Sequence, residues 1–171
     1  MSESLTLYKL IILYMLRRVT FPMTNAQISS FILDQGYTTY FHLQQAISEM
    51  VEANLLRVET IRNSSHYHMT EEGLNTITYF EKEISGAIKE DIHTFLEQNS
   101  YELRNEVSTL ADYYKDTKQD YIVRCQVKER DTDLIVLTLT VPTEDTAKVI
   151  CNNWTKKNQE IYAHLMKELL S

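Results

Sequence analysis

The chain is poor in the residues that most often interrupt helices, with three glycines and two prolines among 171 positions. So few glycines leave little room for a glycine-rich loop that cradles phosphate groups. Cysteine is also scarce, and Cys125 and Cys151 do not have the paired spacing of a zinc site, which usually needs four ligands. We interpret both as small buried apolar side chains, with a disulfide or redox switch as the alternative.

Long apolar runs are missing as well. The longest, Leu10–Leu16, is far shorter than the roughly 20 residues that cross a bilayer. Glu3 precedes this run and Arg17-Arg18 follow it, which is not the layout of a signal peptide. We therefore expect a cytoplasmic protein without a membrane partner.

The residues that are present fit an ordered, helix-rich chain, because 43 % are hydrophobic and 24 % are charged. The net charge is −7. Residues 1–69 balance five Lys or Arg against five Asp or Glu, so the whole excess of acid lies in residues 70–171. Nucleic-acid-binding domains are usually basic, so this distribution permits DNA binding by the first part without giving it a strong positive surface.

The first half has the pattern of a winged helix-turn-helix. Apolar residues at helical spacing are followed by two short β-type segments around a polar turn. The expected elements are helices over Leu5–Arg18, Thr24–Asp34 and Thr38–Ala53, strands over Leu55–Ile61 and His66–Thr70, and a turn at Arg62-Asn63-Ser64-Ser65. Such a module commonly lays its third helix in the major groove of duplex DNA.

Capping residues indicate where these helices begin. Thr24 and Gln27 have the spacing of a capping box, in which each side chain bonds the backbone N–H of the other residue. Thr38 or Thr39 can cap the third helix, and Thr70 can cap a fourth helix that follows the wing.

The second half is expected to combine helices with a small sheet. Ser85-Gly86 is the expected boundary between a domain of residues 1–84 and a domain of residues 85–171. A helix ending near Asn99-Ser100 comes next, and Thr143 caps a long final helix after Pro142. Between them, strands are expected over Val107–Tyr114, Tyr121–Glu129 and Leu134–Val141, with turns at Asp116–Lys118 and Arg130–Asp133. The fold class is therefore α+β: a winged helix-turn-helix, then a three-stranded antiparallel sheet with a long C-terminal helix.

Eight residues of the third helix (about 38–53) and the wing (about 55–70) are candidates for DNA contact. Glutamine can bond adenine through two hydrogen bonds, tyrosine can reach phosphates, and basic wing residues can touch phosphate or enter the minor groove. The candidates are Thr38, Thr39, Tyr40, Gln44, Gln45, Arg57, Arg62 and Asn63. Glu49 and Glu52 confine the expected contact to the N-terminal half of the helix. The alternative is an ordinary solvated helix face and hairpin tip.

The final helix offers a surface for a homodimer. One winged helix reads only a short half-site, so a regulator of this size is expected to pair. Residues at four-three spacing make one seam: Ala147, Cys151, Trp154, Asn158, Ile161 and Leu165. Of these, the expected interface residues are Trp154, Asn158, Ile161 and Leu165. The alternatives are that the seam covers the sheet of its own chain, or that Ile84–Leu96 forms the interface.

No residue pattern indicates catalysis, and we expect neither an enzyme nor a bound cofactor. His66 and His68 alternate on one face of a strand, but no further ligands are spaced to complete a metal site. Trp154 and the tyrosines of the second half either belong to the core or line a pocket for an unknown small-molecule effector.

Several segments resemble known families. Tyr8-Lys9-Leu10-Ile11-Ile12-Leu13-Tyr14, Leu55-Leu56 and His68-Met69-Thr70-Glu71-Glu72-Gly73 resemble PadR-like winged-helix regulators. The second half resembles a bacterial family of unknown function through Ala111-Asp112-Tyr113-Tyr114, Val141-Pro142 and the segment Ala147 to Tyr162 around Cys151-Asn152-Asn153-Trp154. This resemblance implies a winged helix fused to a small α+β domain and a role in transcription regulation. It brings no catalytic residues and no established ligand.

Three hypotheses follow. The first is a cytoplasmic, homodimeric transcriptional regulator that binds duplex DNA. The second is a protein-interaction module that keeps the winged-helix scaffold without binding DNA. The third is a ligand-gated form of the first, with a small-molecule site in the C-terminal domain. PadR-like proteins usually dimerise through C-terminal helices, whereas this chain has a sheet and a helix in that position.

Overall fold

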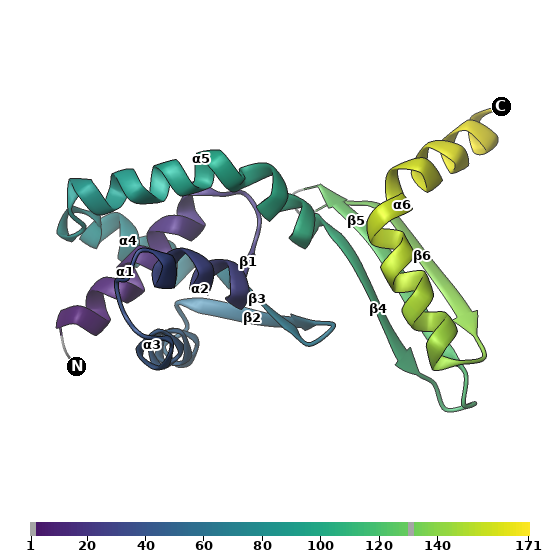
Figure 1. Cartoon of the computed structure of the whole chain (residues 1–171), viewed down its shortest axis with the longest axis horizontal. Helices are drawn as coiled ribbons and strands as arrows, with labels where there is room; N and C mark the ends of the chain where they lie inside the picture. Colours follow the sequence, from purple (N-terminus) through teal and green to yellow (C-terminus); the bar gives the residue numbers. More distant parts are fainter. Residues whose placement is uncertain (1–2, 130–131) are drawn as a thin grey trace. The chain divides into compact units, whose positions relative to one another are not determined.

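The computed structural model describes residues 3–129 and 132–171. These residues form six α-helices, one short 3-10 helix and six strands (Figure 1). The chain divides into two compact units, which meet between Val107 and Ser108. Helices and two small antiparallel sheets are combined in one chain, so the expected α+β class is confirmed.

Unit 1, which ends at Val107, holds most of the helices. Its elements are α1 (Glu3–Arg18), β1 (Met23–Thr24), α2 (Asn25–Asp34), α3 (Tyr40–Glu52), β2 (Leu56–Ile61), β3 (Ser64–Met69), α4 (Glu71–Phe80), η1 (Glu81–Glu83) and α5 (Gly86–Ser108). The strands form an antiparallel sheet in the order β1-β3-β2. The sequence analysis did not anticipate β1, because two residues are too short for a periodic pattern; it pairs Met23 with Tyr67 and Thr24 with His66.

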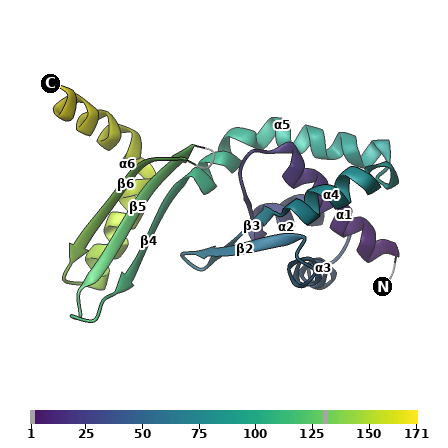
Figure 2. The ribbon, with the colours of Figure 1, turned by 180° about the vertical axis from the view of Figure 1, so that it is seen from behind.

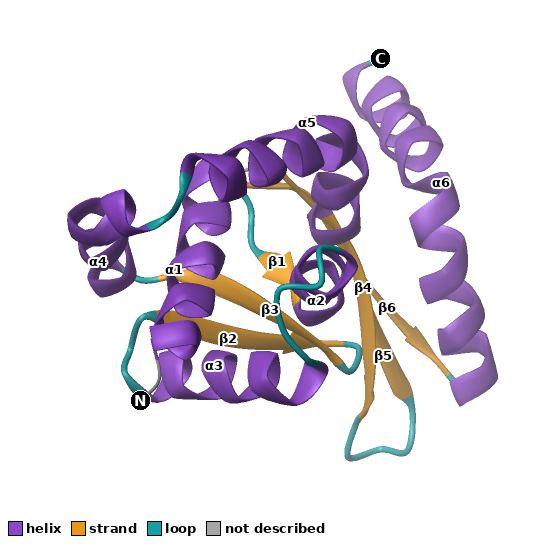
Figure 3. Cartoon of the chain, turned by 60° about the vertical axis from the view of Figure 1, so that its left-hand side comes forward, coloured by secondary structure: helices purple, strands orange, loops and turns teal. Residues whose placement is uncertain are grey.

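The core of unit 1 is built around α1. Every residue from Leu10 to Leu16 is buried, so this stretch of helix is apolar on all sides and surrounded by other elements. Figure 3 shows α1 in the middle of the unit, with α3 and the β2–β3 hairpin beside it. The longest apolar run of the sequence is therefore the central helix of a packed core. None of the helices within residues 3–129 and 132–171 has the length and hydropathy of a membrane span.

The helix caps agree closely with the sequence. Thr24 accepts a hydrogen bond from the Gln27 backbone N–H at 3.1 Å, and the Gln27 side chain accepts one from the Thr24 N–H at 3.0 Å. Of the two candidates for the start of α3, Thr39 is the cap. Thr70 and Thr143 cap α4 and the final helix.

The helix α5 is longer than expected. It was predicted to end near Asn99-Ser100, but it continues to Ser108 and buries Leu103 and Val107. The Asn99 side chain donates to the Phe95 carbonyl, so it bonds within the helix and does not end it. Burial of the later apolar residues outweighs the local turn preference.

This longer helix also moves the boundary between the units. The predicted boundary was Ser85-Gly86, whereas unit 1 extends to Val107. Ile92 and Leu96 of α5 belong to the same core as α1, and Phe95 packs on Phe31 with ring centroids 5.0 Å apart. Gly86 only begins the helix that completes this core.

The β2–β3 turn is tighter than predicted. A four-residue turn was expected over Arg62–Ser65, but Ile61 pairs directly with Ser64 and leaves a two-residue turn. Both turn residues have positive φ angles, 47° at Arg62 and 63° at Asn63. This conformation matches the twist of a hairpin, and it extends β3 by two residues over the predicted start at His66.

Unit 2, from Ser108 onward, is a meander covered by one helix. Its strands β4 (Thr109–Lys115), β5 (Tyr121–Glu129) and β6 (Thr132–Val141) are paired in sequence order, as predicted. Residues 130 and 131 of the predicted Arg130–Asp133 turn lie outside the described residues. The final helix, α6 (Glu144–Leu170), packs on one face of the sheet, and Figure 2 shows the sheet in front of it. Ala147, Cys151 and Trp154 of α6 are buried against Val123 and Cys125 of β5.

Candidate nucleic-acid interface

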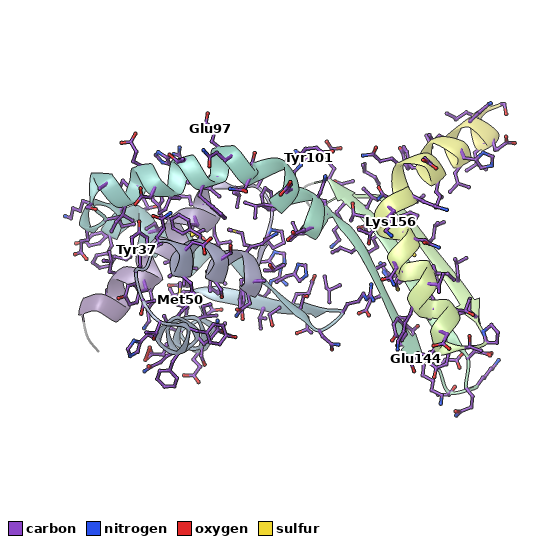
Figure 4. The ribbon with its side chains drawn as sticks, in the orientation of Figure 1. Tyr37, Met50, Glu97, Tyr101, Glu144 and Lys156 are labelled. Atoms are coloured by element: carbon purple, nitrogen blue, oxygen red, sulfur yellow. The ribbon has the colours of Figure 1, made fainter. Side chains whose placement is uncertain are left out.

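The helix α3 has a buried side and an outer side. Leu43, Ala46, Ile47 and Met50 are buried, as their spacing predicted. Met50 is labelled in Figure 4 and is fully enclosed on the inner side of α3. The side chains exposed on the outer side and at the first turn are Tyr40, Phe41, His42, Gln45, Ser48 and Glu52.

Two of these outer residues, Phe41 and His42, were not singled out from the sequence. Phe41 is 74 % exposed, the largest value among the exposed aromatic side chains of the described residues, and its ring contacts that of His42. Residues 41, 45, 48 and 52 share one face at helical spacing, opposite the predicted buried stripe. That spacing was the pattern in the sequence that could have identified Phe41.

The first turn of α3 uses the predicted threonine. The Thr39 hydroxyl accepts a hydrogen bond from the His42 backbone N–H at 3.3 Å and lies 3.2 Å from His42 Nδ1. Thr38 precedes it and is half-buried, while Tyr40 is exposed. Because Thr39 already accepts the His42 and Leu43 N–H groups, the N–H groups of Tyr40 and Phe41 and the Tyr40 hydroxyl are the donors of this turn that can meet an anionic partner.

Gln44 occupies a different environment from its neighbour Gln45. The sequence placed both on the outer side of the helix, but the Gln44 amide forms two hydrogen bonds with the Asn25 amide of α2, at 2.8 and 2.9 Å. It also lies 3.4 Å from the Ser29 hydroxyl. Gln44 therefore joins α3 to α2, whereas Gln45 is exposed. No spacing rule distinguishes the two, because the partner lies 19 residues away.

The acidic residues of α3 also differ from one another. Glu49 pairs with Lys9 of α1, with Nζ and Oε2 3.3 Å apart, so its charge is compensated on the inner side of the helix. Glu52 is exposed at the end of α3. The outer face therefore carries one carboxylate, at its C-terminal end, and the N-terminal half of that face carries none.

The β2–β3 hairpin lies beside α3. A hollow of about 260 Å³ between them is lined in part by Ile47 and Val51 of α3 and by Val58 and Tyr67 of the hairpin. Val58 was predicted to lie opposite Arg57 on the strand, and it faces this hollow while Arg57 is exposed. Side chains of α3 and the hairpin therefore share one surface.

The polar residues of the hairpin are at its tip and along β2. The Arg57 guanidinium is 3.9 Å from the Glu59 carboxylate, a loose and exposed ion pair that holds it only weakly. Arg62 and Asn63 form the two-residue tip and are exposed. The three candidate wing residues are thus all exposed to solvent.

The two histidines of β3 lie on the central strand of the sheet. His66 is buried and His68 is half-buried, opposite Glu59 and Arg57 in the strand pairing. Within residues 3–129 and 132–171, no group of three or more His, Cys, Asp or Glu side chains is arranged to hold a metal ion.

A second hollow, of about 590 Å³, lies between the α1–β1 loop and α5. Its walls carry three basic side chains, Arg18, His93 and Arg104, and one acidic side chain, Glu97. His93 Nε2 is 2.7 Å from the Tyr14 hydroxyl, which fixes the ring in the wall. Phe21 and Leu96 supply apolar surface. This combination suits a small anion with an apolar part.

The predicted dimer seam of α6 has a first part, up to Trp154, that is buried in unit 2, and a second part, from Asn158 to Leu165, that is less buried. Trp154 is 3 % exposed, and its indole N–H donates to the Gln126 carbonyl at 3.1 Å, so it is used within unit 2. Asn158 donates to the Trp154 and Thr155 carbonyls of its own helix. Ile161 packs at the edge of the same core, and Leu165 is half-buried. The first part of the seam therefore covers the chain's own sheet.

The other predicted surface, Ile84–Leu96, is also largely internal. Ile84, Ile92 and Leu96 are buried in the core of unit 1. Their apolar spacing reflects packing against α1 and α2 within unit 1.

The comparison with protein families gives one match. A family model described as a domain of unknown function, DUF4364, matches residues 8–169. No curated protein and no solved structure matches the chain. The match does not bear on the resemblance to PadR-like regulators, which stays a prediction. Because the model spans almost the whole sequence, the chain belongs to the DUF4364 family.

Proposed function

We propose that unit 1 is a winged helix-turn-helix module and that the chain is a homodimeric transcriptional regulator that binds duplex DNA through α3 and the β2–β3 hairpin. The order α1-β1-α2-α3-β2-β3 and the antiparallel β1-β3-β2 sheet support this proposal. The observation that carries it is the outer face of α3, whose side chains are exposed, lie outside the core of unit 1 and stand next to an exposed hairpin.

Each part of this surface has a role in the proposed complex. Gln45 reads a base edge, because its amide is exposed and matches the donor and acceptor pattern of adenine. Phe41 provides apolar contact of the kind that recognises a thymine methyl group. The N-terminal turn of α3 with Tyr40, and Arg57 and Arg62 of the hairpin, contact phosphates.

The electrostatics limit how far α3 enters the groove. Glu49 is compensated by Lys9, so it does not oppose docking of the N-terminal half. Glu52 remains exposed and would repel phosphates at the other end of the helix. The proposed contact is therefore confined to residues 39–45 and the hairpin, and the affinity of one module is modest.

A pair of neighbouring glutamines tests the recognition role. We expect the full chain to select a duplex from a randomised pool, and Gln45→Ala to change the preferred sequence. Gln44→Ala is the matched control: it breaks the Asn25 pair and lowers stability but keeps the preferred sequence. The measurement is selection followed by fluorescence anisotropy on the selected and scrambled duplexes. Identical preferences for wild type and Gln45→Ala would reject α3 as the reader.

The hairpin has a separate test. Arg57→Ala combined with Arg62→Ala should weaken binding to all duplexes and reduce the salt slope of log K by about 2, one unit per lost phosphate contact. Equal affinity of the double variant and wild type would reject the hairpin contact. If no duplex is selected at all, the scaffold hypothesis of a protein-interaction module replaces the regulator.

The hollow beside α5 favours a ligand-gated form of this regulator. The small-molecule site was expected in the C-terminal domain, whereas this hollow lies in unit 1. The α1–β1 loop that forms one wall continues into β1, which pairs with β3 of the hairpin. The other wall, α5, also contacts α2, because Glu106 accepts a hydrogen bond from the Gln27 side chain at 2.6 Å. A ligand between the loop and α5 would therefore touch both supports of the DNA-binding elements.

The anionic class of this effector can be tested with inorganic phosphate. We expect backbone NMR signals of the loop and α5 to shift on phosphate addition in wild type, and not in Arg18→Gln combined with Arg104→Gln. Arg17→Gln is the control, because Arg17 pairs with Glu81 outside the hollow. Shifts that persist in the double variant would reject the site.

A further inference from the structure

The outer strand of the unit 2 sheet is an unprotected edge. In the order β4-β5-β6, strand β6 pairs on one side only, and it is the longest edge strand in the described part of the chain, with ten residues. From Leu134 to Val141 it carries no charged residue. Protein sheets usually protect such edges with charges, prolines, bulges or short strands, because an unpaired strand invites another to pair with it.

The other edges of the two sheets have these protections. The edge strand β2 carries Arg57 and Glu59, and β4 carries Asp112 and Lys115. The remaining edge, β1, is two residues long. Among these edge strands, only β6 is both long and uncharged over most of its length. This composition indicates that a further strand pairs with its outer edge in the functional protein.

The helix α6 leaves β6 accessible. It packs chiefly on β4 and β5, and three large apolar side chains of β6 stay exposed: Leu134 (44 %), Val136 (38 %) and Leu139 (42 %). Within residues 3–129 and 132–171, the backbone hydrogen bonds of β6 go to β5. Its outer row of N–H and C=O groups therefore faces away from the sheet.

The charge distribution indicates which partner can approach this edge. Residues 108–171 hold nine Lys or Arg and ten Asp or Glu, whereas residues 1–107 hold eight and fourteen. Two copies of the chain repel each other most through unit 1 and least through unit 2. The edge of β6 is uncharged and belongs to the nearly neutral unit, so β6 of a second copy can approach it with little charge repulsion.

We propose that β6 pairs with β6 of a second copy, antiparallel about a two-fold axis, to form a continuous six-stranded sheet. This deepens the homodimer of the proposed function and is independent of DNA binding. The two outer edges can face each other only if the axis is perpendicular to the sheet, so both α6 helices lie on the same face. Facing residues must lie on the same face of the sheet, so one residue of β6 lies opposite itself on the axis and at most nine of the ten residues overlap. This overlap adds about eight to ten backbone hydrogen bonds, since residues at alternate positions exchange two.

This arrangement explains how the chain can pair without the α6 seam. Trp154 remains in the core of its own unit, where its N–H is already bonded. Exposed apolar side chains of β6 gain cross-strand neighbours from the copy. The rival surface is the end of α6, where Leu169 and Leu170 are exposed.

Sedimentation velocity of the full chain at micromolar concentration tests the proposal. Thr138→Glu combined with Thr140→Glu places four carboxylates close to the axis, on the face opposite α6, and a carboxylate at position 138 faces the Arg124 guanidinium of its own sheet, so the fold is spared. The strand pairing puts Thr138 opposite Arg124 and Thr140 opposite Ile122, on that open face. We expect the wild type to be a dimer and the double variant a monomer of 20.1 kDa with an unchanged circular dichroism spectrum.

Two controls make the result specific. Tyr114→Glu puts one carboxylate per chain on the open face of β4, at the other edge, and should keep the dimer. Leu169→Glu combined with Leu170→Glu should also keep it. A folded β6 variant that stays dimeric, or loss of the dimer in the α6 variant alone, would overturn β6 pairing. A monomeric wild type would overturn both this inference and the proposed homodimer.

Cysteine cross-linking provides a readout that does not depend on disruption. Single substitutions Val136→Cys, Thr138→Cys and Thr140→Cys place thiols along one face of β6. A residue on the two-fold axis lies opposite itself, within reach of a disulfide, so cross-linking should peak at one position and fall at its neighbours. Tyr114→Cys should not cross-link. Equal cross-linking at all positions would contradict a fixed strand pairing.

Discussion

Of the three glycines, Gly73 is the one whose surroundings leave no room for a side chain. A Cβ atom there would overlap the carbonyl oxygen of Leu55 and come within 2.9 Å of the Met69 side chain. That carbonyl also accepts the Thr70 N–H, so it cannot move without breaking the contact between the hairpin and α4. The close approach of two backbone segments, rather than chain flexibility, explains a glycine in the first turn of a helix.

We expect Gly73→Ala to lower the free energy of unfolding by about 2 kcal/mol, because overpacking against backbone outweighs the better helix propensity of alanine. Gly86→Ala is the matched control. Nothing lies within 4 Å of a Cβ at Gly86, so this change should be neutral or stabilising by up to about 1 kcal/mol. Thermal unfolding of both variants decides it, and a destabilised Gly86→Ala with an unaffected Gly73→Ala would contradict the packing explanation.

Cys125 links stability to alkaline pH. Burial, with the neighbouring Cys151 thiol adding to it, raises the pKa of Cys125 to about 11 from 9.0. The unfolded chain then loses this proton at a lower pH than the folded chain, so stability is full below about pH 9 and falls as the pH rises toward 11. Urea unfolding at pH 8 and pH 10.5 should show a larger loss for wild type than for Cys125→Ala. Equal losses would show that other groups account for the alkaline instability.

At the scale of elements, local signals were enough to predict most helices and strands. The Thr24 capping box and the Thr39, Thr70 and Thr143 caps involve residues three positions apart, so the sequence contains all the information they need. The pairing of Gln44 with Asn25 and the continuation of α5 depend on neighbours far along the chain. The boundary between the units could not be predicted for the same reason.

The hairpin tip combines a strained residue with a candidate DNA contact. Arg62 has a positive φ of 47°, a conformation that costs a residue with a side chain about 1–2 kcal/mol relative to the usual backbone regions. We expect Arg62→Gly to stabilise the fold by about 0.5–1 kcal/mol, after the entropic cost of glycine in the unfolded chain, and to weaken duplex binding. Asn63→Gly should gain less stability, because asparagine tolerates this conformation. Chemical unfolding and anisotropy on the same samples measure both effects; a destabilised Arg62→Gly would show that the arginine supports the fold rather than a partner.

At the scale of the whole molecule, α5 determines where the chain can be divided. Side-chain hydrogen bonds tie it to the residues before it: Tyr37 donates to Asp91 at 2.7 Å, Tyr14 pairs with His93, and Gln27 donates to Glu106 and to the Leu103 carbonyl. Burial, reinforced by the bond to Asp91, raises the pKa of Tyr37, so this hydroxyl stays protonated and bonded. The helix is therefore part of the core of unit 1.

Truncation tests this division directly. A fragment of residues 1–107 should unfold cooperatively, because it keeps Ile92, Leu96 and Leu103 over the core. A fragment of residues 1–84, which ends at the boundary that the sequence indicated, should lose cooperative unfolding, since removing three buried apolar side chains of this size costs on the order of 6 kcal/mol. That loss is comparable to the total stability of a small domain. Thermal melts followed by circular dichroism and the dispersion of NMR signals measure the outcome. Equal melting of the two fragments would show that α5 only links the two units.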